Sequence, residues 1–153
     1  MTFPTDLMQF GPDADRQLLF EGVVSDRSWP RPGTFGLTTM YALGDCHREK
    51  LADPAVYARW LDVLLSPRGI DMTPHGEARI EEFGVGSLHG ISFDQRITTS
   101  LVAGYEDRAT GTLYVYVCSC KPYDPRRVDE VSREYFGTDG SRSTLDTFCL
   151  RAP

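Results

Sequence analysis

Four cysteines and the polar residues near them are the side chains of this chain best suited to chemistry. Two cysteines follow β-type runs directly: Cys46 lies in Gly44–His47, and Cys120 ends the run that begins at Thr112. Cys120 is a candidate general acid or nucleophile, because Lys121 and the start of a following helix would both favour its thiolate. The alternative is a half-buried thiol at the end of a strand, since free cysteines are often buried.

Other polar residues add candidates of two kinds. Ser100 could act as a nucleophile, although a serine within a strand is the simpler interpretation. Glu106 and Asp107 form an acid pair that could bind a ribose or an amine, or could be a solvated hairpin loop. Cys46 could face the same ligand or be a plain turn residue. His47, which follows it, is the histidine best placed to join it.

The cysteine spacing does not fit a metal site. Cys118 and Cys120 are too close in sequence for the usual structural zinc pair, so we expect no bound metal. Residues Met1–Phe10 lack the basic start and apolar core of a secretion signal. We therefore expect a cytoplasmic protein with reduced thiols, because disulfides are rare in that compartment.

Length and charge restrict the class of protein. The chain has 153 residues, enough for one domain with a proper core. It carries 16 Lys and Arg against 22 Asp and Glu, a net charge of −6. A nucleic-acid-binding protein needs a basic surface to neutralise phosphates, so that class is excluded. No apolar run is long enough to cross a bilayer, and we expect no membrane partner.

Hydrophobic periodicity and turn residues predict the elements that position these side chains. Two helices begin at Asp-Pro pairs, Asp53-Pro54 and Asp124-Pro125, because Asp caps a helix and Pro suits its first turn. The stretches 78–83 and 88–93 are either two strands or one bulged strand. The expected strands span residues 16–24, 34–43, 78–83, 88–93, 97–105, 112–118 and 143–150.

The two halves of the chain repeat one pattern: a strand, a cysteine-bearing exit, an Asp-Pro cap and an amphipathic helix. The pattern predicts a duplicated β-α-β unit and an α+β fold. Two helices would cover one face of a largely antiparallel sheet, as a two-layer α/β sandwich formed by residues 34–153. Residues 1–33 would form an N-terminal arm. We expect the two cysteine-bearing exits to share one cavity.

This order of elements resembles that of the bacterial-type S-adenosylmethionine decarboxylases, over residues 34–150. The resemblance implies a small α/β sandwich that cuts itself at a serine to make a pyruvoyl cofactor, with pairs of protomers forming the site. The segments that carry it are Met40-Tyr41, Gly44–Cys46, Leu51–Pro54, Leu88–Ile91 and Val115–Cys120.

The family's chemistry needs a serine, a histidine and a cysteine, and Cys120 takes the place of the cysteine. Reading without gaps from Gly90 puts Ile97 at the serine and Val102 at the histidine, so no pyruvoyl group can form. The family's acid then falls on an arginine, Arg96. We favour this register because it keeps the hydrophobic alternation continuous.

Counting back from Cys120 instead puts Ser100 at the serine and Tyr105 at the histidine. That register keeps a nucleophile and lacks an imidazole. Catalytic roles would then fall to Cys120, Ser100 and Tyr105.

Three functions remain open. The first is a decarboxylase-like protein that binds S-adenosylmethionine or a related nucleoside or amine, has no pyruvoyl cofactor, and runs a different reaction such as elimination or group transfer. The second is a non-catalytic paralogue that dimerises with an active enzyme and regulates it. The third is a self-processing pyruvoyl decarboxylase acting through Ser100. The resemblance also implies a homodimer.

Overall fold

The computed structural model describes residues 34–151, and side chains from residue 36 to residue 147. The predicted arm, 1–33, and its strand at 16–24 lie outside the described residues. The described helices are α2 Arg48–Leu51, α3 Pro54–Leu65 and α4 Arg126–Phe136. The described strands are β1 Thr34–Gly44, β2 Arg79–Val85, β3 Leu88–Ile97, β4 Ser100–Asp107, β5 Thr112–Ser119 and β6 Arg142–Arg151.

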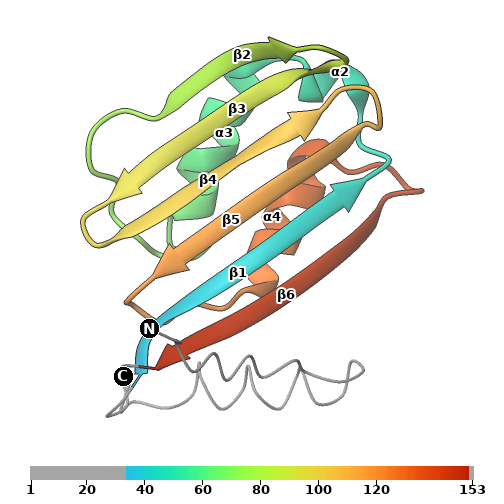
Figure 1. The fold of residues 1–153 in the computed structure, drawn as a ribbon. Coiled ribbons are helices and arrows are strands. Elements are labelled where there is room, and N and C mark those ends of the chain that lie inside the picture. Colours follow the sequence, from blue (N-terminus) through green and yellow to red (C-terminus); the bar gives the residue numbers. More distant parts are fainter. Residues whose placement is uncertain (1–33, 152–153) are drawn as a thin grey trace, which may run out of the picture.

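The six strands form one sheet in the order β2-β3-β4-β5-β1-β6, and every neighbouring pair is antiparallel. Helices α3 and α4 lie side by side on one face of this sheet (Figure 1). The predicted α+β two-layer sandwich is confirmed. Each long helix also joins two strands that run in the same direction, β1 to β2 through α3 and β5 to β6 through α4.

Both predicted helix starts are confirmed. The Asp53 carboxylate accepts a hydrogen bond of 2.9 Å from the Ala55 N–H, with Pro54 at the first helical position of α3. The Asp124 carboxylate accepts one of 3.0 Å from the Arg126 N–H at the start of α4. Each cap satisfies an N–H group that the first turn of a helix leaves without an intrahelical partner.

Two details of the prediction were wrong. The strand predicted at 97–105 is divided: β3 ends at Ile97, two threonines turn the chain, and β4 begins at Ser100, which pairs with Ile97. The residues between His47 and Asp53, for which no helix was predicted, form the short helix α2. The stretches 78–83 and 88–93 belong to two strands, joined at Gly86 with a φ of 62°.

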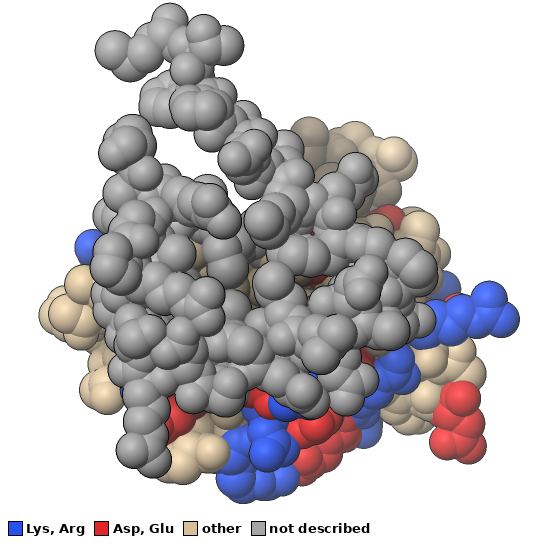
Figure 2. Space-filling view, turned by 90° about the horizontal axis from the view of Figure 1, so that it is seen from below, with Lys and Arg blue, Asp and Glu red and all other residues tan. Residues whose placement is uncertain are grey.

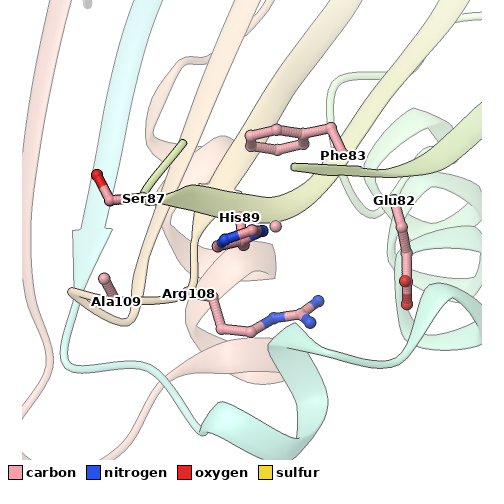
Figure 3. A pocket seen from close by; sticks show the side chains of 7 residues that line it. Glu82, Phe83, Ser87, His89, Arg108 and Ala109 are labelled. Carbon is pink, nitrogen blue, oxygen red and sulfur yellow. The ribbon is translucent and has the colours of Figure 1, made fainter. Parts of the chain in front are cut away.

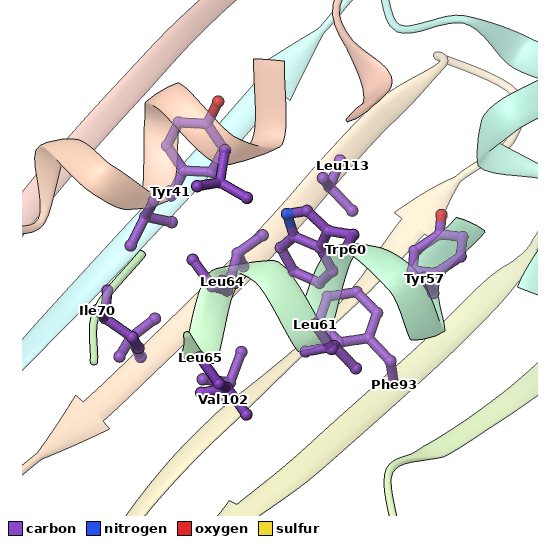
Figure 4. Close-up of a cluster of buried hydrophobic side chains, with 14 of the residues drawn as sticks. Tyr41, Tyr57, Trp60, Leu61, Leu64, Leu65, Ile70, Phe93, Val102 and Leu113 are labelled. Atoms are coloured by element: carbon purple, nitrogen blue, oxygen red, sulfur yellow. The ribbon is translucent and has the colours of Figure 1, made fainter. Parts of the chain in front are cut away.

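The core lies between the helices and the sheet. Trp60 and Tyr57 of α3 meet Phe93 of β3 (Figure 4) and Phe136 of α4, with ring centroids 5.0 to 5.7 Å apart. The Trp60 indole N–H donates to the Ser132 hydroxyl at 3.2 Å, which links the two long helices. All four aromatic side chains are buried, so this cluster fixes α3 and α4 against the sheet.

The other face of the sheet carries more exposed apolar side chains. Tyr105 stacks on Tyr114 with ring centroids 4.9 Å apart, and Phe83 meets Tyr105 edge-on at 6.3 Å. Leu101 and Tyr116 also point to this face, because side chains alternate along a strand, and both are more than a third exposed.

Charged side chains of both signs are interspersed on the side of the molecule seen in Figure 2. Surface ion pairs include Arg127–Glu130 at 2.6 Å and Arg68–Glu134 at 3.0 Å. Such exposed pairs stabilise a fold by about 0–1 kcal/mol each. No helix among the described residues is long and apolar enough to span a membrane.

Candidate functional site

The two cysteine-bearing strand exits lie at opposite ends of the sheet. In the antiparallel β1–β5 pair, Leu37 is opposite Ser119 and Leu43 is opposite Leu113. Six residues of strand separate these two levels, a distance of about 20 Å. The prediction that both exits share one cavity is therefore wrong within a single chain. We call the two regions the Cys120 end (residues 71–75, 98–100 and 119–121) and the Cys46 end (residues 45–48 and 106–111).

The Cys120 end brings together two residues that the sequence analysis selected. The turn between β3 and β4 places Thr99 Oγ1 2.8 Å from the Cys120 sulfur. The Ser100 hydroxyl donates to Ser119 Oγ at 2.8 Å, across the neighbouring strands β4 and β5. Ser119 Oγ in turn accepts from the Lys121 N–H and donates to the Lys121 carbonyl, both at 2.9 Å. Cys120 and Ser100 thus lie in one hydroxyl-rich neighbourhood.

Lys121, expected to favour the Cys120 thiolate, is directed elsewhere. Its ammonium group donates to the Asp71 carbonyl at 2.7 Å and lies 3.8 Å from the Asp71 carboxylate. The hydroxyl of Thr99 is a polar contact of the Cys120 sulfur. Cys120 itself is exposed to solvent, so a ligand can approach its thiol.

The observed turn removes the reason for preferring Ile97 at the position of the serine. Continuous alternation was the criterion, and the turn after Ile97 interrupts it. Ile97 is 92% buried at the end of β3, whereas Ser100 opens β4 beside Cys120. Ser100, the serine of the register counted back from Cys120, therefore lies at the turn, and Ile97 lies in the core.

Tyr105, the third predicted catalytic residue, lies far from the other two. It is five residues from Ser100 along β4, about 17 Å, and on the opposite face of the sheet. Its ring stacks on Tyr114, and burial raises the pKa of its hydroxyl above the usual value. The arrangement does not place Tyr105 where it could exchange a proton with Ser100.

His75, which was not among the residues selected from the sequence, belongs to the Cys120 end. Its N–H donates to the Arg96 carbonyl at 2.8 Å, and Pro74 forms a β-bridge with Ile97. The loop after α3 thus passes the end of β3, next to the turn that precedes Ser100. No short-range pattern predicts this contact, because twenty-one residues separate the two hydrogen-bonded residues.

Cys46 is a core residue. Its side chain is buried, its thiol donates to the Leu43 carbonyl at 3.2 Å, and its N–H donates to the Gly111 carbonyl at 3.1 Å. Burial raises the pKa of the Cys46 thiol to about 11. A thiol that stays protonated and faces the core is unsuited to ligand binding. Its neighbour His47 is exposed, and its N–H donates to the Phe136 carbonyl at 2.9 Å.

The predicted acid pair at Glu106 and Asp107 separates into two different environments. The Asp107 carboxylate closes the β4–β5 loop by accepting from the Ala109 N–H at 3.0 Å and the Thr110 hydroxyl at 2.9 Å. Glu106 points inward and is fully buried. Burial raises the pKa of Glu106, although Arg108 opposes this shift.

A pocket of about 420 Å³ opens beside Arg108 at the Cys46 end of the sheet, and the sequence analysis missed it. Figure 3 shows Arg108 and His89 below the β2–β3 hairpin, with Glu82 at the side. The pocket is lined by Glu82, Phe83, Ser87, His89, Gly90, Arg108 and Ala109. Among the described residues, no three His, Cys, Asp or Glu side chains gather in a way that could hold a metal ion.

No protein-family model matches the chain, and no curated protein is significantly similar to it. The resemblance to the S-adenosylmethionine decarboxylases therefore depends on the order of the elements and on the placement of Cys120 and Ser100.

Proposed function

We propose that this chain is a decarboxylase-like protein that binds S-adenosylmethionine or a related nucleoside or amine at the Cys120 end. It works in the cytoplasm as a homodimer, without a pyruvoyl cofactor. The observation that supports this most is the contact of 2.8 Å between Thr99 Oγ1 and the Cys120 sulfur, at a turn that also presents Ser100. An exposed thiol beside hydroxyl groups can donate or accept a proton at a bound ligand.

The proposed chemistry is elimination or group transfer with Cys120 as the general acid or nucleophile. Glu106, Asp107, Cys46 and His47 were predicted to bind the substrate, and they lie about 20 Å away in the same chain. Glu106 and Cys46 are buried, so only the exposed His47 and the half-buried Asp107 could contribute to the proposed site, and only from a second protomer. The homodimer is therefore part of this proposal.

Thermal unfolding with and without S-adenosylmethionine tests the proposal, because a ligand that binds the folded state raises the melting temperature. We expect a rise with the native chain and a clearly smaller rise with Cys120→Ala. Cys118→Ala is the matched control, since Cys118 is also exposed and points to the other face. No rise at saturating ligand would contradict the binding proposal and favour a non-catalytic regulatory partner.

A second candidate, the self-processing pyruvoyl decarboxylase, is favoured by one observation. Ser100 follows the turn directly, and the backbone contact with Arg96 holds His75 at the same end of the sheet. An imidazole there could assist attack of the Ser100 hydroxyl on the Thr99 carbonyl, which moves the acyl group from the Ser100 nitrogen to its oxygen. Elimination from this ester would release the Thr99 carboxylate and leave dehydroalanine at residue 100, and hydrolysis of the dehydroalanine would give the pyruvoyl group and ammonia. Mass spectrometry under denaturing conditions distinguishes the two: a single 17.2-kDa chain supports the first proposal, and two fragments divided before Ser100 support the second.

A further inference from the structure

The pocket beside Arg108 has features of a binding site that the proposed function does not use. It is formed by the β2–β3 hairpin and the end of β4, and its volume of about 420 Å³ suits a small metabolite. Side chains of opposite charge border it, Glu82 on one side and Arg108 on the other (Figure 3). His89 of β3 also lines it, whereas the Phe83 ring points to the opposite side of the hairpin, toward Tyr105.

Arg108 is held in place from behind by a buried carboxylate. Arg108 Nε donates to Glu106 Oε1 at 3.1 Å, and Nη2 lies 3.1 Å from the same oxygen. The Glu106 side chain is fully buried, whereas the Arg108 side chain is 42% exposed. One edge of the guanidinium is thus fixed by Glu106, and the remainder of the side chain borders the pocket.

The pair is incompletely satisfied. Arg108 Nη2 is shielded from solvent and, among the described residues, has no acceptor in hydrogen-bond geometry. Glu106 Oε2 is shielded in the same way and, within the described part of the chain, has no donor in hydrogen-bond geometry, although the Ile91 N–H is close enough to lower the pKa of this carboxyl. Unsatisfied buried polar atoms are rare in native proteins, and an ion pair that only stabilised the fold would be expected to complete its hydrogen bonds.

The charges indicate the class of ligand. A simple anion would be attracted by Arg108 and repelled by Glu82. A simple cation would be attracted by Glu82 and repelled by Arg108. We propose that this pocket binds the zwitterionic group of an α-amino acid, with the carboxylate on Arg108 and the ammonium group toward Glu82. Glu106 is a positioning residue that holds Arg108 and does not touch the ligand. The proposal is independent of the chemistry at the Cys120 end.

Three matched probes test the proposal on the full chain. L-leucine carries both charges, 4-methylpentanoate lacks the amine, and isopentylamine lacks the carboxylate. We expect millimolar L-leucine to shift the amide signals of residues 82–90 and 106–109 in NMR spectra, and each single-charge probe to bind at least about tenfold more weakly. Binding of either single-charge probe as tight as that of L-leucine, or no binding of L-leucine, would overturn the proposal.

Variants locate the probe in the pocket. Glu82→Gln should weaken L-leucine binding about tenfold, and Glu81→Gln should leave it unchanged because Glu81 points to the other face of the same strand. Arg108→Gln alone would leave Glu106 buried without its partner and could prevent folding. The double variant Arg108→Gln with Glu106→Gln keeps the interior neutral and should also lose binding. Unchanged affinity in Glu82→Gln or in a folded double variant would contradict the site.

Discussion

The Cys120 end and the Cys46 end begin from the same sequence pattern and have opposite properties. Each has a strand, a cysteine, an Asp-Pro pair and a helix. At one end Cys120 is exposed and contacts the Thr99 hydroxyl, whereas at the other Cys46 is buried and donates to a backbone carbonyl.

A local sequence pattern therefore specifies a strand or helix and its cap, whereas the neighbouring strands determine which residues surround the cap. Because β1 and β5 are antiparallel, the two cysteines leave the sheet in opposite directions. The β4–β5 loop contacts the first cysteine through Gly111, and the β3–β4 turn contacts the second through Thr99.

The largest expected effect is a loss of stability caused by disturbed packing at the Cys46 end. A methyl group at Gly90 would overlap the Glu106 carbonyl oxygen, so Gly90→Ala should lower the free energy of unfolding by about 3 kcal/mol. At the Cys120 end, Gly36→Ala would meet the Ser119 carbonyl oxygen at 3.1 Å and should lower it by about 1 kcal/mol. Urea unfolding measures both, and equal losses would show that the two ends are packed alike.

Thiol labelling distinguishes the two cysteines directly. Because the pKa of Cys46 is about 11, roughly one in a thousand of its side chains is a thiolate at pH 8. The side chain is also buried. Iodoacetamide should therefore modify Cys46 on the order of 100-fold more slowly than Cys120. Mass spectrometry of digested protein follows each thiol separately, with the exposed Cys118 as an internal control. Similar labelling rates for Cys46 and Cys120 would contradict the expected difference between the two ends.

Replacing each cysteine by alanine tests the same difference between the Cys46 end and the Cys120 end. Cys46→Ala removes a buried side chain and its hydrogen bond, and should lower the free energy of unfolding by about 1–2 kcal/mol. Cys120→Ala changes an exposed side chain and should alter it by less than about 0.5 kcal/mol. A larger loss for Cys120→Ala, measured by urea unfolding, would assign Cys120 a structural role.

The smallest expected effect is a pH dependence at the Cys46 end. The pKa of Glu106 is raised by burial, so the stability this group contributes is complete below its unfolded pKa and is lost as the pH rises through the folded one. Glu106→Gln lacks this titration, and its stability relative to the native chain should increase between pH 4 and pH 8. Glu81→Gln controls for the loss of one charge. A difference that stays constant with pH would show that Glu106 does not titrate in this range.

Much of the fold could be predicted because its signals are local. Apolar spacing and the Asp53 cap predicted α3, and alternation predicted β1 and β5. The turn between β3 and β4 was missed because Thr98 and Thr99 favour strands and neither is a glycine or a proline.

The candidate site was harder to predict because it depends on strand direction. Cys120 and Ser100 are brought together by the β4–β5 pairing, which the predicted hairpin already implied. The burial of Glu106, and the approach of His75 to the end of β3, follow from contacts between distant segments. Such contacts have no local signature in a single sequence.

The place of β1 in the strand order has a consequence for biosynthesis. Of the described strands, β1 leaves the ribosome first, yet its two neighbours, β5 and β6, are the last to be made. Both edges of β1 stay without their partners β5 and β6 until those strands have emerged, so the sheet can close only after all six described strands have been made. A nascent or C-terminally shortened chain without β6 would present one edge of β1 as a template for aggregation.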